Sequence, residues 1–159
     1  MGAGPDLAAL YRTHGHIVLR RARRLLGNTE DARDVLQQIF TSLVREPSRF
    51  RGDSSFATYL YSATTSACLQ LIRNGRTRGA LLETRVAPAQ RTAADPEAEN
   101  LVAVRELVAN LPEQLASAVI YYYVDGMTHE EIAEQLGCSR RHVGNLIESA
   151  IQSVQKAAG

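Results

Sequence analysis

The 159-residue chain contains no tryptophan and no apolar run as long as the roughly 18 residues that a membrane-spanning helix needs. Residues 1–6 also lack the basic stretch followed by an apolar stretch that marks a signal peptide. We therefore expect a cytoplasmic protein with no membrane partner.

Cysteine is also scarce: only Cys68 and Cys138 occur, each among apolar neighbours. We expect two reduced thiols, because nothing else in the sequence points to an oxidising compartment. None of the four histidines lies at a zinc-ligand spacing from cysteines or carboxylates. No carboxylate pair, nucleophile–base set or phosphate-binding loop stands out either. We expect neither a cofactor, metals included, nor an enzyme.

The net charge of +1 conceals an uneven distribution along the chain. Residues 1–79 carry twelve arginines against six acidic residues, whereas residues 101–159 carry four basic against seven acidic residues. A basic first half indicates contact with a polyanion. The arginines at 20–24 are interpreted as a solvated helix face rather than as a DNA contact.

The period-two alternation of strands is absent, and apolar residues recur at helical spacing instead. A first helix is expected from the cap Asp6 to Leu26, and a third over 55–74. The second has the clearest apolar stripe, which ends before Pro47 and comprises Ala32, Val35, Leu36, Ile39, Phe40, Leu43 and Val44.

Residues 80–96 have no sustained periodicity and hold two prolines, which is typical of a linker. We predict an all-α fold of two small helical domains, 1–79 and 97–159, joined by this flexible linker at 80–96. The consecutive tyrosines at 121–123 are interpreted as packing residues.

The segment 128–153 has the pattern of a helix-turn-helix. Thr128 and Glu131 have the spacing of a capping box, in which each side chain bonds the other's backbone amide. Gly137 suits the tight turn, since a left-handed backbone costs glycine least. The second helix would project its first turns outward and present Ser139, Arg140, Arg141, His142 and Asn145 to DNA bases and phosphates. The alternative is a helical hairpin that only packs.

These residues resemble a known family. Leu111-Pro112-Glu113 and the segment 125–139 are similar to region four of bacterial sigma factors, and 31–40 resembles the region-two helix that docks on the RNA polymerase clamp. The segment 56–61 resembles the start of the next helix. In order, spacing and length, the chain resembles the extracytoplasmic-function (ECF) group of the sigma-70 family.

The resemblance implies a factor that binds core RNA polymerase at its clamp and flap and directs promoter-specific initiation. Region two would open the −10 promoter element, and region four would read the −35 element in the major groove. An anti-sigma factor is a further partner that the resemblance allows.

It also implies candidate sites. The polymerase-binding candidates are Asp31, Asp34, Gln37 and Gln38. The −10 candidates are Arg49, Arg51, Asp53, Ser54, Phe56, Tyr59, Arg73 and Arg76. A polar loop suits an extruded base, and arginines neutralise phosphates. Each set has a simpler explanation. The polymerase candidates could only complement the helix dipole, the loop at 49–55 could be a plain surface connection, and Arg73 and Arg76 could lie at a solvated helix end.

Several positions depart from the family pattern. Tyr59 stands where tryptophan is usual, and 144–149 replaces a basic stretch of the last helix. We therefore expect region four to bind DNA weakly alone and to depend on tethering by polymerase. Two alternatives stay open: a sigma mimic that sequesters a regulator, and a free-standing dimeric repressor that binds a palindrome.

Overall fold

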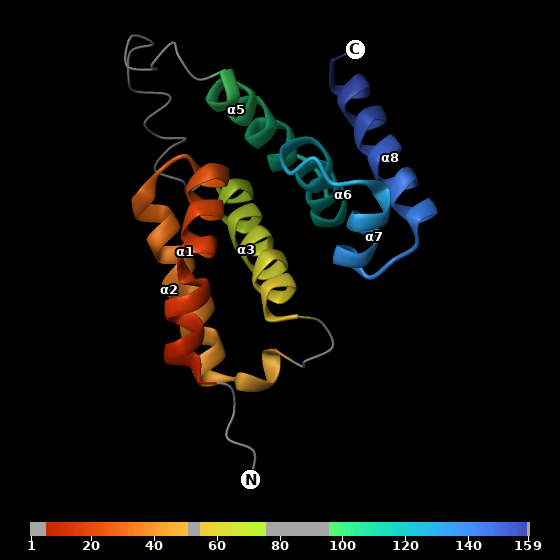
Figure 1. The fold of residues 1–159 in the computed structure, drawn as a ribbon. Helices are drawn as coiled ribbons and strands as arrows, with labels where there is room; N and C mark the ends of the chain where they lie inside the picture. The colour runs from red at the N-terminus through yellow and green to blue at the C-terminus, as the bar shows by residue number, and fades with distance from the viewer. Residues whose placement is uncertain (1–5, 51–54, 76–95, 159) are drawn as a thin grey trace, which may run out of the picture.

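The computed structural model describes residues 6–50, 55–75 and 96–158, without the side chains of 96–100 and 157–158. Within these ranges every regular element is helical and no strand occurs, which confirms the predicted fold class. The elements are α1 (Leu7–Leu26), α2 (Thr29–Arg45), the 3-10 helix η1 (Pro47–Arg49), α3 (Phe56–Arg73), α5 (Pro96–Ala109), α6 (Glu113–Val119), the π-helical turn η3 (Ile120–Val124), α7 (His129–Leu136) and α8 (Arg140–Ala158) (Figure 1). None of these described helices is long and apolar enough to cross a membrane.

Most of the predicted helix ends are confirmed, and local hydrogen bonds explain them. The Asp6 carboxylate accepts from two amides of the first turn of α1, and Gly27 ends that helix with a left-handed φ of 82°. Asn28 and Ser55 cap α2 and α3 in the same way as Asp6. Pro112 is the N-cap of α6.

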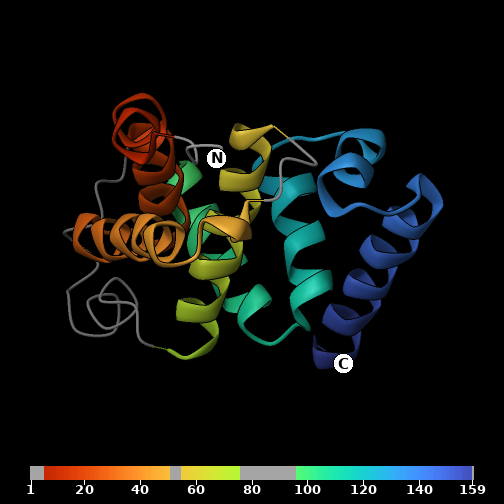
Figure 2. The same cartoon turned by 90° about the horizontal axis from the view of Figure 1, so that it is seen from below.

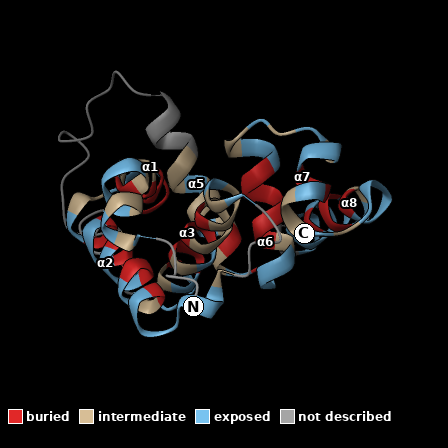
Figure 3. Ribbon diagram, turned by 60° about the horizontal axis from the view of Figure 1, so that its bottom comes forward, coloured by how far each residue is buried: buried red, intermediate tan, exposed pale blue. Residues whose placement is uncertain are grey.

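Helices α1, α2 and α3 form an N-terminal bundle, and α5 to α8 form a C-terminal bundle. Figure 3 shows the buried residues on the inward faces of α2, α3, α6 and α8. The apolar stripe predicted for the second helix is buried except at Val44, which is exposed. The N-terminal bundle therefore has the core that its periodicity indicates.

The two bundles are not separate bodies with separate cores. Val108, Leu111 and Val119 of the C-terminal bundle belong to the same buried cluster as Leu69 and Ile72 of α3. A smaller cluster unites η3, α7 and α8 around Tyr121, Ile132, Ala133, Val143, Leu146 and Ile147. Helix α3 contacts α1 and α2 on one side and α5, α6 and α7 on the other, and Figure 2 shows it between the two bundles.

Both cysteines are free thiols, as expected. Cys68 is buried in the larger cluster, and burial raises its pKa to about 12, so it is an unreactive thiol at neutral pH. Cys138 is half-buried beside the smaller cluster.

Candidate nucleic-acid interface

Helix α7 begins with the predicted capping box. The Thr128 amide donates to Glu131 Oε1 at 3.0 Å, and the Glu131 amide donates to Thr128 Oγ1 at 3.1 Å. These hydrogen bonds from Thr128 favour the charged carboxylate, so they lower the pKa of Glu131. The first helix of the helix-turn-helix thus begins at a defined residue.

The turn between α7 and α8 is equally defined. Gly137 has a left-handed φ of 71°, and the amides of Gly137 and Cys138 both donate to the Ala133 carbonyl, at 2.9 and 3.0 Å. Ser139 then caps α8, because its Oγ accepts from the His142 amide at 3.0 Å. Ile132 and Val143 are fully buried where the two helices meet. The predicted motif is therefore present as a packed unit.

All five residues predicted to read DNA from this unit are exposed: Ser139, Arg140, Arg141, His142 and Asn145. They lie on the first turns of α8, where the backbone amides also give the helix its partial positive charge. The later turns add little positive charge, since Glu148 and Ser149 are also exposed and Lys156 lies near the helix end. The surface that can contact DNA is therefore short.

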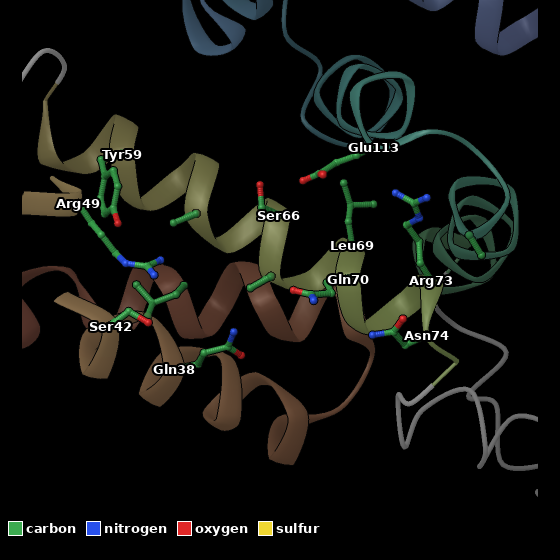
Figure 4. Close-up of a pocket in the computed structure, with 14 residues that line it drawn as sticks. Gln38, Ser42, Arg49, Tyr59, Ser66, Leu69, Gln70, Arg73, Asn74 and Glu113 are labelled. Atoms are coloured by element: carbon green, nitrogen blue, oxygen red, sulfur yellow. The ribbon is translucent and has the colours of Figure 1, made fainter. Parts of the chain in front are cut away.

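A second polar surface lies in the N-terminal bundle. A cleft of about 740 Å³ runs between α2 and α3, with η1 at one end and the ends of α5 and α6 at the other (Figure 4). We call it the α3 cleft. Three −10 candidates line it (Arg49, Tyr59 and Arg73), and so does the polymerase candidate Gln38. The structure thus brings together residues from three separate elements.

The aromatic candidates have different positions. Phe56 lies within a cluster of rings, with centroids 5.1 Å from Phe50, 6.2 Å from Tyr59 and 5.3 Å from His14. Tyr59 lines the cleft, and its partial burial raises the pKa of its phenol while nearby Arg49 lowers it. Phe56 therefore packs beside the Tyr59 ring, and Tyr59 is the one of these two aromatic candidates that lines the cleft.

The two arginines of the cleft are both largely exposed, and one of them pairs with an acidic side chain. Arg49 pairs with Glu46 at 3.0 Å, but both side chains are more than half exposed, so this pair is weak. Arg73 is exposed on the last turn of α3. The candidates Arg51, Asp53, Ser54 and Arg76 lie outside the described residues.

Sequence reasoning missed other polar residues of the cleft. Ser66 and Gln70 line it together with Tyr59 and Arg73. Counted from Tyr59 they fall at i+7 and i+11, which places them on one helical face. That spacing is the signal that identifies them.

The four polymerase-binding candidates differ in how far their side chains are buried. Asp34, Gln37 and Gln38 are exposed on α2. Asp31, in contrast, is only 6% exposed, and its carboxylate accepts from the Asn28 side chain at 2.8 Å. The expectation that Asp31 faces a partner disagrees with this burial, because its carboxylate helps to form the cap of α2.

Two interpretations of clustered residues need revision. Arg20, Arg23 and Arg24 are exposed as expected, but Arg21 is buried, so the description of 20–24 as a solvated face is wrong for that residue. Of the three tyrosines, Tyr121 is buried in the smaller cluster, whereas the next two are exposed. The packing interpretation therefore holds fully for Tyr121, while the exposed Tyr122 still lies with its ring centroid 5.5 Å from that of His129 in α7.

Family models match both bundles. "Sigma-70 region 2" matches residues 10–78, and "Sigma-70, region 4" matches residues 101–153. The first range contains the α3 cleft up to Asn74, and the second contains the helix-turn-helix.

Individual proteins are similar over most of the chain. "ECF RNA polymerase sigma factor SigM" of Mycobacterium tuberculosis is 33% identical over 130 residues, which cover 80% of this chain and 64% of that protein. "ECF RNA polymerase sigma factor SigE" of Mycolicibacterium smegmatis is 30% identical over 164 residues, covering 96% and 62%. "RNA polymerase sigma-H factor" of Pseudomonas aeruginosa is 28% identical over 162 residues, covering 93% and 83%. The chain thus spans less than two thirds of the first two relatives.

Proposed function

The chain belongs to the ECF group of the sigma-70 family, and on that premise we propose that it binds core RNA polymerase and directs promoter-specific initiation. Its domains are region two at 1–79 and region four at 97–159, with 80–96 between them. The observation that carries the proposal is the presence of two different polar surfaces with exposed arginines on one chain, the α3 cleft and the first turns of α8.

Region two acts on the −10 element through the α3 cleft. The cleft combines an aromatic face at Tyr59 with cations at Arg49 and Arg73. Stacking on an aromatic ring and neutralisation of phosphates are the two interactions that hold single-stranded DNA. The loop candidates Arg51, Asp53 and Ser54, together with Phe56 and Arg76, complete this assignment.

Region four reads the −35 element through Arg140, Arg141, His142 and Asn145, with Ser139 at the helix start. Arginine can donate two bonds to guanine, and asparagine can pair with adenine. Because few other cations lie on α8, the affinity for DNA depends on the tether that polymerase supplies.

Two surfaces are assigned to core polymerase. The clamp contacts Asp34, Gln37 and Gln38, which are exposed side by side on α2. The flap occupies an apolar groove between α5, η3 and α8, where Tyr123 and Ile151 are exposed although they are large and apolar. Exposed apolar patches of this kind mark protein interfaces. The groove leaves the first turns of α8 free for DNA.

The decisive experiment combines the purified chain with core polymerase, measures transcription from genomic promoters and sequences the DNA retained in a pull-down. We expect transcripts from a defined promoter set. Asp34→Arg should abolish retention of polymerase, whereas Arg141→Ala should retain polymerase but relax promoter choice. Glu134→Arg, the same charge reversal on α7 outside either surface, is the matched control.

The other functions predict different outcomes. Polymerase that is neither retained nor redirected to any promoter would overturn the proposal. Retention without transcription would favour a sigma mimic. A dimer that binds a palindrome without polymerase would favour the repressor. An anti-sigma partner is a separate proposal, to be tested by co-purification from cells.

A further inference from the structure

The last turns of α1 carry a cluster of cations that belongs to neither of the surfaces proposed for DNA. An open hollow of about 560 Å³ lies over these turns and is lined by His16, Leu19, Arg20, Arg23 and Arg24. We call it the α1 hollow. All five residues belong to α1, and none of them lines the α3 cleft. Its volume is within the range of sites that bind small ligands.

Helical periodicity brings the basic residues of the hollow together. Counted from His16, the three arginines fall at i+4, i+7 and i+8, which is one face of a helix. All four basic side chains are exposed, while Leu19, the one apolar residue of the lining, is half-buried. The stretch 7–26 contains neither aspartate nor glutamate, so no acidic side chain of α1 interrupts this basic face.

The three arginines of the hollow have few partners within the protein. Neither salt bridge among the described residues involves any of them. Arg24 donates one hydrogen bond, to the Val124 carbonyl at 3.3 Å. Arg21, the remaining arginine of this segment, is buried and donates to both carboxylate oxygens of Asp125, at 2.6 and 2.9 Å. One arginine is thus paired inside the protein, whereas the three of the hollow keep most of their donors for a ligand.

Stabilisation of α1 explains only part of this cluster. Cations in the last turn of a helix interact favourably with the helix dipole, and Arg23 and Arg24 lie in the last turn of α1. That interaction falls off within one turn, so it does not explain Arg20 or His16. Like charges four residues apart, as at Arg20 and Arg24, destabilise a helix. A bound anion would remove this repulsion.

The donors of the hollow suit adjacent phosphate groups. Each guanidinium presents a planar fork of N–H donors that matches two oxygens of one phosphate. The basic residues lie within about 12 Å along the helix axis. On adjacent turns, Arg20, Arg23 and Arg24 form a triangle rather than a row. A triangle of cations suits a compact ligand with two or three linked phosphates better than it suits an extended strand.

We infer that the α1 hollow binds a small ligand with linked phosphate groups, either free inorganic polyphosphate or the phosphate tail of a nucleotide. Arg20 and Arg23 are the principal contacts, because Arg24 already donates to a backbone carbonyl. His16 adds an imidazole N–H donor at the same face. The inference does not rest on the proposed function, since no residue of the hollow belongs to a surface assigned to DNA or to polymerase.

The site is tested by isothermal titration calorimetry on the full chain, with sodium tripolyphosphate as the probe. Low ionic strength is required, because salt screens exposed charges. We expect saturable binding by the unmodified chain. The double variant Arg20→Gln with Arg23→Gln should bind on the order of tenfold more weakly, since two charge-assisted contacts are lost. Both side chains are exposed, so the variant should fold, which circular dichroism checks.

A matched double variant separates the hollow from general positive charge. Arg140→Gln with Arg141→Gln removes the same two charges from the other exposed pair of arginines, on α8, and should leave tripolyphosphate binding unchanged within about twofold. Amide signals of residues 16–24 should shift in NMR spectra during the titration. Equal weakening by both double variants, the absence of saturable binding, or shifts confined to α8 would each overturn the inference.

Two further probes identify the source of the phosphate groups. ATP that binds no more tightly than tripolyphosphate would support free polyphosphate as the ligand, whereas tighter binding of ATP would support a nucleotide. A short DNA duplex is the third probe. If only the duplex binds, and Arg20→Gln with Arg23→Gln weakens that binding, the hollow is part of a nucleic-acid surface and the small-ligand site is overturned. None of these measurements involves polymerase or a promoter, so their failure is distinct from failure of the proposed function.

Discussion

The two bundles differ strongly in the surfaces that we propose for DNA. The N-terminal bundle has a polar cleft in which Arg49 of η1 lies with Tyr59 and Arg73 of α3. The C-terminal bundle has a short exposed surface on α8, followed along the helix by Glu148. Net charge follows the same division, with the excess of arginine in residues 1–79. Most of the cleft lining thus comes from α2, η1 and α3, whereas the candidate surface of α8 consists of its first turns.

The bundles also differ in what stabilises them. The larger cluster of buried residues contains the whole N-terminal core together with residues of α5, α6 and α8. The smaller cluster is confined to the C-terminal bundle and one neighbouring tyrosine, Tyr61. Mutations in the larger cluster should therefore affect both bundles, and mutations in the smaller one should affect a single bundle.

The largest expected effect tests this asymmetry. Leu69→Ala, in the larger cluster, should lower the free energy of unfolding by about 2–5 kcal/mol and increase amide exchange in α1, α2, α3 and α5. Ile132→Ala is expected to cost a similar amount but to increase exchange mainly in α7 and α8. Both side chains are at most 1% exposed, so they are matched in burial. Equal exchange across the chain for Ile132→Ala would contradict the division.

Local signals in the sequence predicted much of this architecture. The cap at Asp6, the stripe of the second helix, the capping box and the turn at Gly137 all depend on residues within a few positions of each other. The fold class and the exposed face of α8 follow from such patterns.

The contact between the bundles could not be predicted in this way. Arg21 and Asp125 are 104 positions apart, and no periodicity links them. Each had an adequate local explanation, Arg21 as part of a basic helix face and Asp125 as part of a turn. The burial of Asp31 was missed for a related reason, since an acid near a helix start also suits the helix dipole. Contacts between residues far apart in the chain decide which side chains are buried, and local patterns in a single sequence do not reveal those contacts.

The next prediction compares the two DNA surfaces in the polymerase complex. Beyond the change in promoter choice expected above, Arg141→Ala should cost about 1–3 kcal/mol of promoter affinity, and that change should consist of a relaxed choice of base at one −35 position. Arg73→Ala should weaken binding to all sequences alike. It should also lower the slope of log affinity against log salt concentration by about one. Affinities for base-substituted promoters at several salt concentrations measure both.

Arg12→Ala, which removes an exposed charge of α1 outside the cleft, is the control for net charge. A loss of base preference in Arg73→Ala, or an equal loss of affinity for all promoter sequences in Arg141→Ala, would contradict the roles given to the two surfaces.

A smaller effect compares helix caps in the two bundles. Thr128→Ala and Ser55→Ala should each lower the free energy of unfolding by about 1 kcal/mol. Only Thr128→Ala should alter how the free energy of unfolding depends on pH. The pKa of Glu131 is lowered in the folded chain, so its ionised carboxylate contributes fully to the free energy of unfolding above the ordinary carboxyl pKa. That contribution is lost as the pH falls through the lowered pKa. Thermal melts between neutral and acidic pH measure this, and an acid limb unchanged by Thr128→Ala would show that the capping box does not titrate.

The smallest expected effect concerns one glycine inside a helix of each bundle. Gly144 of α8 and Gly15 of α1 both have negative φ, and an added Cβ would meet only ordinary contacts, 3.9 Å from His129 and 3.8 Å from Leu36. Alanine at either position should therefore raise the free energy of unfolding by about 0.5–1 kcal/mol. Gly137→Ala is the control, because its left-handed φ should make the same change destabilising. Since Gly144 lies beside Asn145 on the reading surface, Gly144→Ala also tests whether stiffening α8 improves −35 binding. A gain in stability with no gain in promoter affinity would indicate that the weakness of this surface comes from its few cations rather than from a frayed helix.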